Sequence, residues 1–249
     1  MIGRRSVLSL ALLCAFCISA IETTTASAGP TTFDCLANPS GTLHGPHCLS
    51  AGPPALYSHA TIAPGKEFGI VVTNENTASE TTASAVSVLA GTLSGVETEL
   101  QCTGVESSGE GAMENTEVGG VMGTHGTATL TYTGCTVLKP AGKSCAVNES
   151  MVTTKVLFGE GLSATELKFT PKTGETFAEI TIEKCTVTSL NNTFPVTGSV
   201  VTTVSGSTVT STVAGTKAQK TLKFGGQVAG LGGSDTVKTG GTKTPVSLT

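Results

Sequence analysis

A small group of metal-ligand residue types lies near the start of the chain. His44 and His47 stand close to Cys48, with Asp34 and Cys35 upstream of them. Imidazole and thiolate groups suit zinc and copper, so this group is a candidate metal site. In an exported chain, however, Cys48 is expected to be oxidised, which removes its thiolate. We therefore expect no metal and no cofactor, and metal binding by His44 and His47 is only a remote alternative.

The chain contains few residues that could form a nucleophilic catalytic site. The chain contains no Gly-x-Ser-x-Gly pattern. In many hydrolases this pattern forms the strained turn that exposes the catalytic serine. A Ser-His-Asp triad would need Asp34 or Asp235, of which one lies in the cysteine-rich start and the other in a glycine-rich tail. The other two histidines, His59 and His125, each stand alone. The sequence predicts no catalytic residue and no enzyme.

Acidic residues occur in local groups along predicted strands. Glu97 and Glu99 alternate with apolar residues or threonine, and so do Glu179 and Glu183. Glycoside hydrolysis needs two carboxylates beside a sugar cleft, usually with aromatic rings on which the sugar stacks. The chain has no Trp and 2 Tyr. Since alternate residues of a strand face opposite sides, we interpret these carboxylates as parts of solvated strand faces.

The first residues read as an export signal over 1–28. Arg4 and Arg5 precede an apolar stretch over 7–21, and small residues follow at 26–28. The apolar stretch is too short to span a membrane comfortably, and no second apolar run of about 18 residues follows it. We expect a cleaved bacterial signal peptide, a mature chain without a transmembrane segment, and a protein that is secreted, extracellular or held at the cell surface.

Charge and composition exclude other classes. The net charge is -4 and only 13% of residues are charged, against about 25% in average soluble proteins. Without a basic stripe, nucleic acid is not an expected partner. Sparse helix formers exclude a coiled coil, and a mean hydropathy of +0.20 argues against disorder. A threonine-rich extracellular protein remains, with an unidentified extracellular or envelope partner.

Six cysteines follow the predicted signal peptide: Cys35, Cys48, Cys102, Cys135, Cys145 and Cys185. An even number in an exported chain predicts disulfide bonds. Cys35 and Cys48 are expected to close a local loop, because Pro and Gly separate them. For the other four, two pairings remain open: Cys102–Cys135 with Cys145–Cys185, or Cys135–Cys145 with Cys102–Cys185.

Alternation of apolar and polar residues predicts antiparallel strands. Residues 96–102 place Leu100 and Thr98 on one face and glutamates on the other. Further candidate strands span 68–73, 127–133, 151–158, 167–170, 177–183, 200–204, 208–213 and 221–224. The turn residues 171–174 predict that the strands on either side of them form a hairpin. Such short, evenly spaced strands predict an all-β fold, an antiparallel β-sandwich or barrel-like structure stapled by disulfides.

The predicted organisation has three parts after the signal peptide. Residues 29–59 are rich in Pro, Gly and Cys and are expected to form an irregular, disulfide-closed cap. Residues 60–195 form a β-rich core. Residues 196–249 are Thr- and Gly-rich strands that continue the same fold, either as one sandwich or as two stacked half-domains with a break near 195.

Several short motifs occur in order along the chain: Phe33-Asp34-Cys35, Gly95 to Leu100, Lys139 to Cys145, Thr176 to Ile180 and Leu190 to Phe194. With these motifs the chain resembles a group of uncharacterised secreted β-rich proteins of soil actinobacteria. In that group, relatives that lack counterparts of Cys102 and Cys135 keep those of Cys145 and Cys185. The resemblance therefore implies the pairing Cys102–Cys135 with Cys145–Cys185. It implies fold and secretion but no mechanism.

Together these features favour a secreted or surface-associated, non-catalytic β scaffold with a structural or interaction role. The alternative is an extracellular module that binds a ligand or a polymer. That alternative requires a deep pocket with convergent polar groups.

Overall fold

The computed structural model describes residues 29–44, 48, 53, 55–73, 86–109, 111–118, 121–205, 208–211, 221–239 and 246–248. The predicted signal peptide, 1–28, lies outside these residues and stays a prediction. The described chain consists of antiparallel strands and two single turns of 3-10 helix, η1 (Asn148–Ser150) and η2 (Thr188–Leu190). The predicted all-β, antiparallel, barrel-like class is confirmed.

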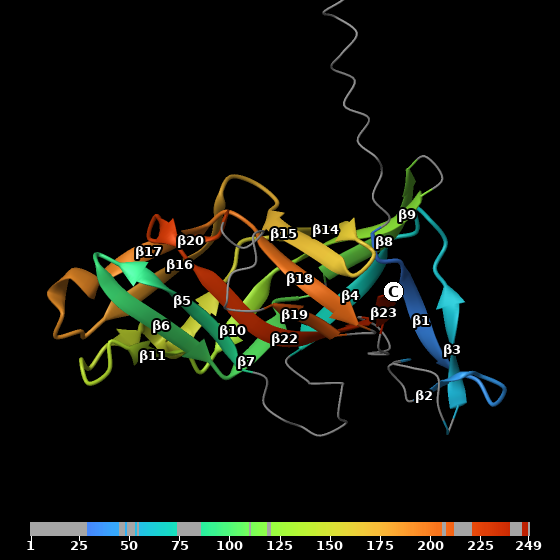
Figure 1. The fold of residues 1–249 in the computed structure, drawn as a ribbon, viewed down its shortest axis with the longest axis horizontal. Helices are drawn as coiled ribbons and strands as arrows, with labels where there is room; N and C mark the ends of the chain where they lie inside the picture. Colours follow the sequence, from blue (N-terminus) through green and yellow to red (C-terminus); the bar gives the residue numbers. More distant parts are fainter. Residues whose placement is uncertain are drawn as a thin grey trace, which may run out of the picture.

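Eight described strands form a closed ring in which each is hydrogen-bonded antiparallel to the next (Figure 1). In ring order they are β4 (Phe68–Thr73), β8 (Gly111–Val118), β9 (Val121–Ala128), β14 (Leu157–Ser163), β15 (Glu166–Pro171), β18 (Val200–Ser205), β19 (Thr208–Ser211) and β22 (Gly230–Thr239), which pairs with β4. Closure of the ring pairs the strand edges that an open sheet would expose. It also encloses the inward-facing side chains, which alternate with outward-facing ones along each strand.

A second curved run of strands continues the molecule to the left in Figure 1. In pairing order it comprises β5 (Ser87–Leu93), β6 (Val96–Cys102), β11 (Thr136–Lys139), β12 (Ala146–Val147), β16 (Thr176–Glu183), β17 (Asn192–Thr197), β20 (Lys223–Phe224) and β21 (Gln227–Val228). The long strand β22 connects the two parts. Its residues 230–232 pair with β5, and its residues from Gly233 onward pair with β19 and then β4.

Three further strands link the ring to this run: β7 (Gly104–Ser107), β10 (Leu130–Thr133) and β13 (Met151–Thr153). β7 pairs with β10 and, through Glu106, with Thr73 of β4. β10 pairs in turn with β13. The strands after residue 195 thus pair with strands before it in both parts of the molecule, as in the ladders β15–β18 and β5–β22.

The predicted irregular cap is more regular than expected, and this part of the prediction is wrong. A four-stranded sheet forms there, in the order β2 (Leu43–His44), β3 (Ala55–Thr61), β1 (Thr32–Ala37) and β23 (Val246–Leu248). The two longer segments, TFDCLA and ALYSHAT, contain neither Pro nor Gly. No strand-breaking Pro or Gly therefore interrupts either of these two strands. We call this sheet the cap sheet.

The predicted hairpin around residues 171–174 is also wrong. β15 pairs with β14 and β18, whereas β16 pairs with β12 and β17. The segment 154–156 lies between their ends: Lys172 N donates to Val156 O, and Lys155 N donates to Phe177 O. Because this segment takes the hydrogen bonds that a hairpin would use, the chain passes at Pro171 from the ring to the second run of strands.

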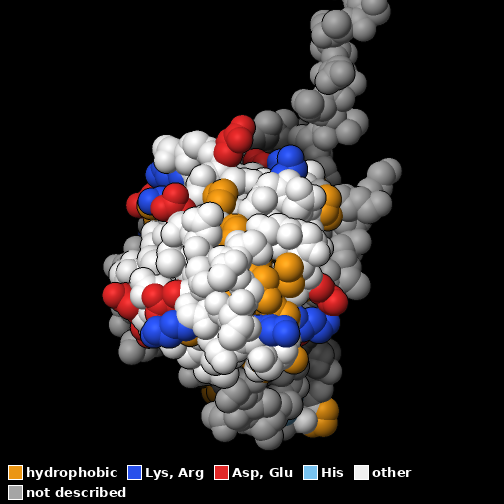
Figure 2. All heavy atoms as spheres, turned by 90° about the vertical axis from the view of Figure 1, so that its left-hand side faces the viewer, with side chains coloured by type: hydrophobic (Ala, Val, Ile, Leu, Met, Phe, Trp, Pro, Cys, Tyr) orange, Lys and Arg blue, Asp and Glu red, His pale blue; other side chains and the backbone are white. Residues whose placement is uncertain are grey.

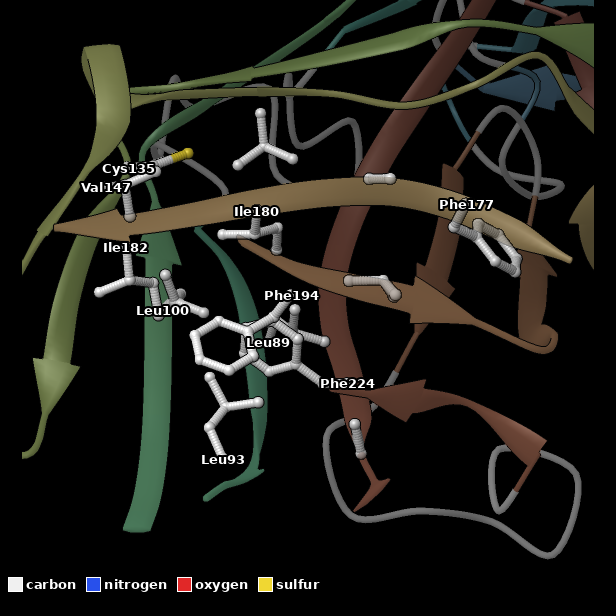
Figure 3. Packing of buried hydrophobic residues seen from close by; sticks show 14 of the residues in the cluster. Leu89, Leu93, Leu100, Cys135, Val147, Phe177, Ile180, Ile182, Phe194 and Phe224 are labelled. Carbon is white, nitrogen blue, oxygen red and sulfur yellow. The ribbon is translucent and has the colours of Figure 1, made fainter. Parts of the chain in front are cut away.

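The hydrophobic core follows the same division. A larger cluster lies within the second run, where Phe194 and Phe224 meet edge to face with ring centroids 6.1 Å apart (Figure 3). A smaller cluster, including Ile70 and Val237, lies within the ring, and Phe169 packs against both. Outside, the end of the molecule farthest from the cap sheet shows mainly uncharged polar side chains and backbone (Figure 2). Outward-facing threonine favours strands without adding apolar surface.

Candidate functional site

An apolar cavity of about 160 Å³ runs through the interior where the ring meets the second run of strands. The ring contributes Ile70, Leu157 and Val237, and the second run contributes Leu100 and Ile180. Figure 3 shows Leu100, Ile180 and Phe177 projecting from β6 and β16 into this interior. The cavity is therefore built by strands from both halves of the fold.

Small residues at inward positions keep this space open. Gly126, Gly159, Gly233, Ala128 and Ala178 all line the cavity. A Cβ atom on Gly159 would lie 2.6 Å from the Phe169 ring, so glycine at this position lets the ring lie flat against the strand. With 8 Phe, 2 Tyr and no Trp in the chain, few large side chains remain to fill the inside of a wide ring. The cavity follows from this composition.

Asp235 places a carboxyl group in the cavity wall. It lies in β22, where Leu231, Gly233 and Val237 also face the cavity. Its Oδ1 is buried, and no described residue hydrogen-bonds to it. Because burial disfavours the charged form, the pKa of Asp235 is raised from its usual range to about 7. A lone buried carboxyl group is unusual in a protein interior.

Tyr132 of β10 is a second titratable group of the wall. Burial raises the pKa of its phenol, and the negative charge of Asp235 raises it further. Both groups are therefore neutral in mildly acidic solution. In that state, a carboxylic acid and a phenol add two hydrogen-bond donors to a mainly apolar wall.

His125 of β9 also touches the cavity, but its imidazole is already engaged. Its Nε2 lies 2.7 Å from Glu114 Oε1, and its ring lies 5.8 Å from that of Phe158. Among the described residues, no Ser or Cys forms a hydrogen bond with His125. The nucleophile–base pair that covalent catalysis requires is therefore not assembled around it.

The candidate metal group is not brought together in the described residues. Cys48 is bonded to Cys35, so neither sulfur is a thiolate. His44 lies in β2, and His47 lies outside the described residues. No group of three or more potential metal ligands occurs in the part of the chain that the structure describes. His59, in β3, stacks on Phe33 at 4.7 Å, and burial lowers its pKa.

The predicted acidic groups lie on outer strand faces. Glu97 and Glu99 of β6 both pair with Lys139 of β11, at 2.8 and 3.1 Å. Glu179 is exposed on β16, and Glu183 lies 3.0 Å from Lys184. These carboxylates lie on outer strand faces, as predicted, and none of them is among the residues that line the cavity.

All three expected disulfide bonds are present: the local bridge Cys35–Cys48, and the pairs Cys102–Cys135 and Cys145–Cys185 that the resemblance implies. The first holds β1 of the cap sheet to the loop after β2. The other two join strands or turns of the second run. The alternative pairing of Cys135 with Cys145 is wrong.

Asp235 is the candidate site residue that the sequence analysis did not place in a strand, because its glycine-rich surroundings suggested a tail. The signal was the alternation of Leu231, Gly233, Asp235 and Val237, which is the pattern of a strand with one buried face. The chain matches no known protein family, no curated protein and no solved structure. The resemblance to secreted actinobacterial proteins stays a prediction.

Proposed function

We propose that this protein is a secreted binding protein, rather than an enzyme, that takes a small, mainly apolar molecule into its interior cavity. The observation that carries the proposal is the cavity itself, about 160 Å³ in volume and walled almost entirely by hydrocarbon. An engineered apolar cavity of about 150 Å³ in another protein binds benzene. A molecule built on one six-membered ring therefore matches this space.

The energetics of packing support binding over a purely structural role. Empty volume in a core destabilises a protein by roughly 24 cal/mol per Å³, so this cavity corresponds to about 4 kcal/mol. A scaffold selected for rigidity alone would gain by filling it. A ligand that binds in the cavity restores the packing contacts that the empty space lacks. The cavity therefore favours the second function suggested by the sequence, an extracellular module that binds a ligand.

The second part of the proposal is that the protein has an extracellular location. Three disulfide bonds are typical of proteins that fold in an oxidising compartment. In the described part of the chain, no helix is long and apolar enough to cross a membrane. The disulfide-linked β scaffold expected from the sequence becomes, in this proposal, the frame that holds the binding cavity.

Titration of the mature protein with ethylbenzene tests the proposal. Methyl NMR should show saturable shifts of the cavity residues Ile70, Leu157 and Ile180, and the melting temperature should rise with ligand concentration. The exposed Leu36 and Val228 serve as internal controls and should not shift. Absence of saturable shifts at the cavity methyl groups would overturn the proposal.

A further inference from the structure

One feature of the cavity wall separates it from a simple hydrocarbon void. Asp235 lines the cavity, and its Oδ1 is buried without a hydrogen-bond partner among the described residues. Buried polar atoms in proteins are almost always paired. A carboxyl group that lines a cavity and has an unpaired oxygen is a position where a bound molecule can supply a donor.

The described residues that line the cavity supply no counter-charge to Asp235. Among the described residues that line the cavity, none is Lys or Arg. The titratable groups of the wall are Asp235 on β22, Tyr132 on β10 and His125 on β9, and the imidazole of His125 is paired with Glu114. The neighbouring wall residues on β4 and β5 are Ile70, Val72, Ser87 and Leu89, which carry no charge.

We propose that the ligand is a small apolar amine, whose ammonium group donates a hydrogen bond to the carboxyl group of Asp235 while its hydrocarbon part fills the cavity. This inference rests on the proposed function and names the ligand class of the same site. An ammonium ion provides both the donor and the positive charge that the wall lacks, and charge-assisted hydrogen bonds are the stronger ones. An anionic ligand would meet the Asp235 carboxylate without any compensating cation.

Three ring-sized probes distinguish the possibilities: benzylamine, its neutral analogue ethylbenzene, and benzoate. Calorimetric titrations are carried out at about pH 5.5 and about pH 8.5, where an alkyl amine stays mostly protonated. Because the pKa of Asp235 is about 7, the ionised fraction of its carboxyl group rises about thirtyfold between these conditions. We expect benzylamine to bind at least about tenfold more tightly at the higher pH, and ethylbenzene to bind equally at both.

The variant Asp235→Asn keeps the shape of the side chain and removes its charge. It should bind benzylamine more weakly, with no pH dependence, and retain ethylbenzene binding. Glu179→Gln, the same change at an exposed position on β16, should bind both probes like the wild type. The pH comparison on wild-type protein needs no variant, so the test holds even if Asp235→Asn folds poorly.

The outcomes separate the two proposals. Ethylbenzene binding with no preference for benzylamine at either pH, or with a preference for benzoate, overturns the amine inference and leaves the cavity function standing. Failure of every probe to bind overturns the proposed function, and the amine inference with it.

Discussion

The side-chain amide of Asn115 hydrogen-bonds both backbone groups of Thr32. Thr32 N donates to Asn115 Oδ1 at 2.9 Å, and Asn115 Nδ2 donates to Thr32 O at 2.9 Å. The same Nδ2 also donates to Ile62 O at 3.0 Å. Since Asn115 lies in β8 of the ring and Thr32 begins β1, one fully buried amide joins the cap sheet to the ring.

We expect Asn115→Ala to destabilise the protein by about 2–4 kcal/mol, because it leaves three buried backbone groups without partners. Urea unfolding at neutral pH measures the change. The exposed Asn192→Ala is the matched control and should change stability by less than about 0.5 kcal/mol. Equal unfolding midpoints for the two variants would show that the amide does not hold the cap sheet in place.

The sequence predicted those strands whose polar and apolar residues alternate cleanly. β4 and β6 have the predicted bounds, 68–73 and 96–102. Alternation depends only on which face of a strand is buried, so it can be read from neighbouring residues. The disulfide pairs also follow the prediction, which rested on local spacing for Cys35–Cys48 and on the resemblance for the other two.

Ring closure and the cavity could not be predicted in the same way. Closure depends on partners far apart in sequence, such as Val72 of β4 and Val237 of β22. The cavity depends on how many strands surround the interior and on the small side chains, such as Gly126 and Gly159, that meet there. Neither ring closure nor the size of the cavity can be read from the alternation of neighbouring residues. Asp235 belongs to the cavity wall because β22 closes the ring, and this closure cannot be read from the residues around Asp235.

Asp235 should make the stability of the ligand-free protein pH-dependent. Its pKa is raised from 3.8 to about 7 in the folded state. Between these values the folded protein keeps a proton that the unfolded chain has released, so the free energy of unfolding falls as pH rises through this range. Above pH 7 the loss is complete and amounts to about 2–4 kcal/mol.

The variant Asp235→Asn isolates this contribution. It should be more stable than the wild type at about pH 8 and nearly equal to it at about pH 4. Chemical unfolding across this range measures the difference, with Glu179→Gln as the exposed acid-to-amide control. A difference that does not change with pH would show that the carboxyl group is not buried in the folded state.

Filling the cavity should raise stability and abolish binding together. Ala128→Phe places an aromatic ring in the space beside Leu157, its cross-strand neighbour. Cavity-filling substitutions commonly stabilise proteins by about 0.5–2 kcal/mol, and the new ring occupies the volume that ethylbenzene would use. The exposed Met151→Phe is the control, because it adds an aromatic ring outside the cavity. Ethylbenzene binding to a folded Ala128→Phe variant would place the binding site elsewhere.

The three disulfide bonds should differ in their effect on stability according to the length of chain they close. Cys35–Cys48 spans 13 residues, whereas Cys145–Cys185 spans 40. The chain-entropy model assigns about 3 kcal/mol to the shorter loop and about 4 kcal/mol to the longer one.

Replacing each pair with two alanines and measuring urea unfolding tests this order. Replacement of Cys145 and Cys185 should lower the free energy of unfolding by about 1 kcal/mol more than replacement of Cys35 and Cys48. The reverse order would mean that local packing around the cap sheet, rather than loop closure, decides what each bridge contributes.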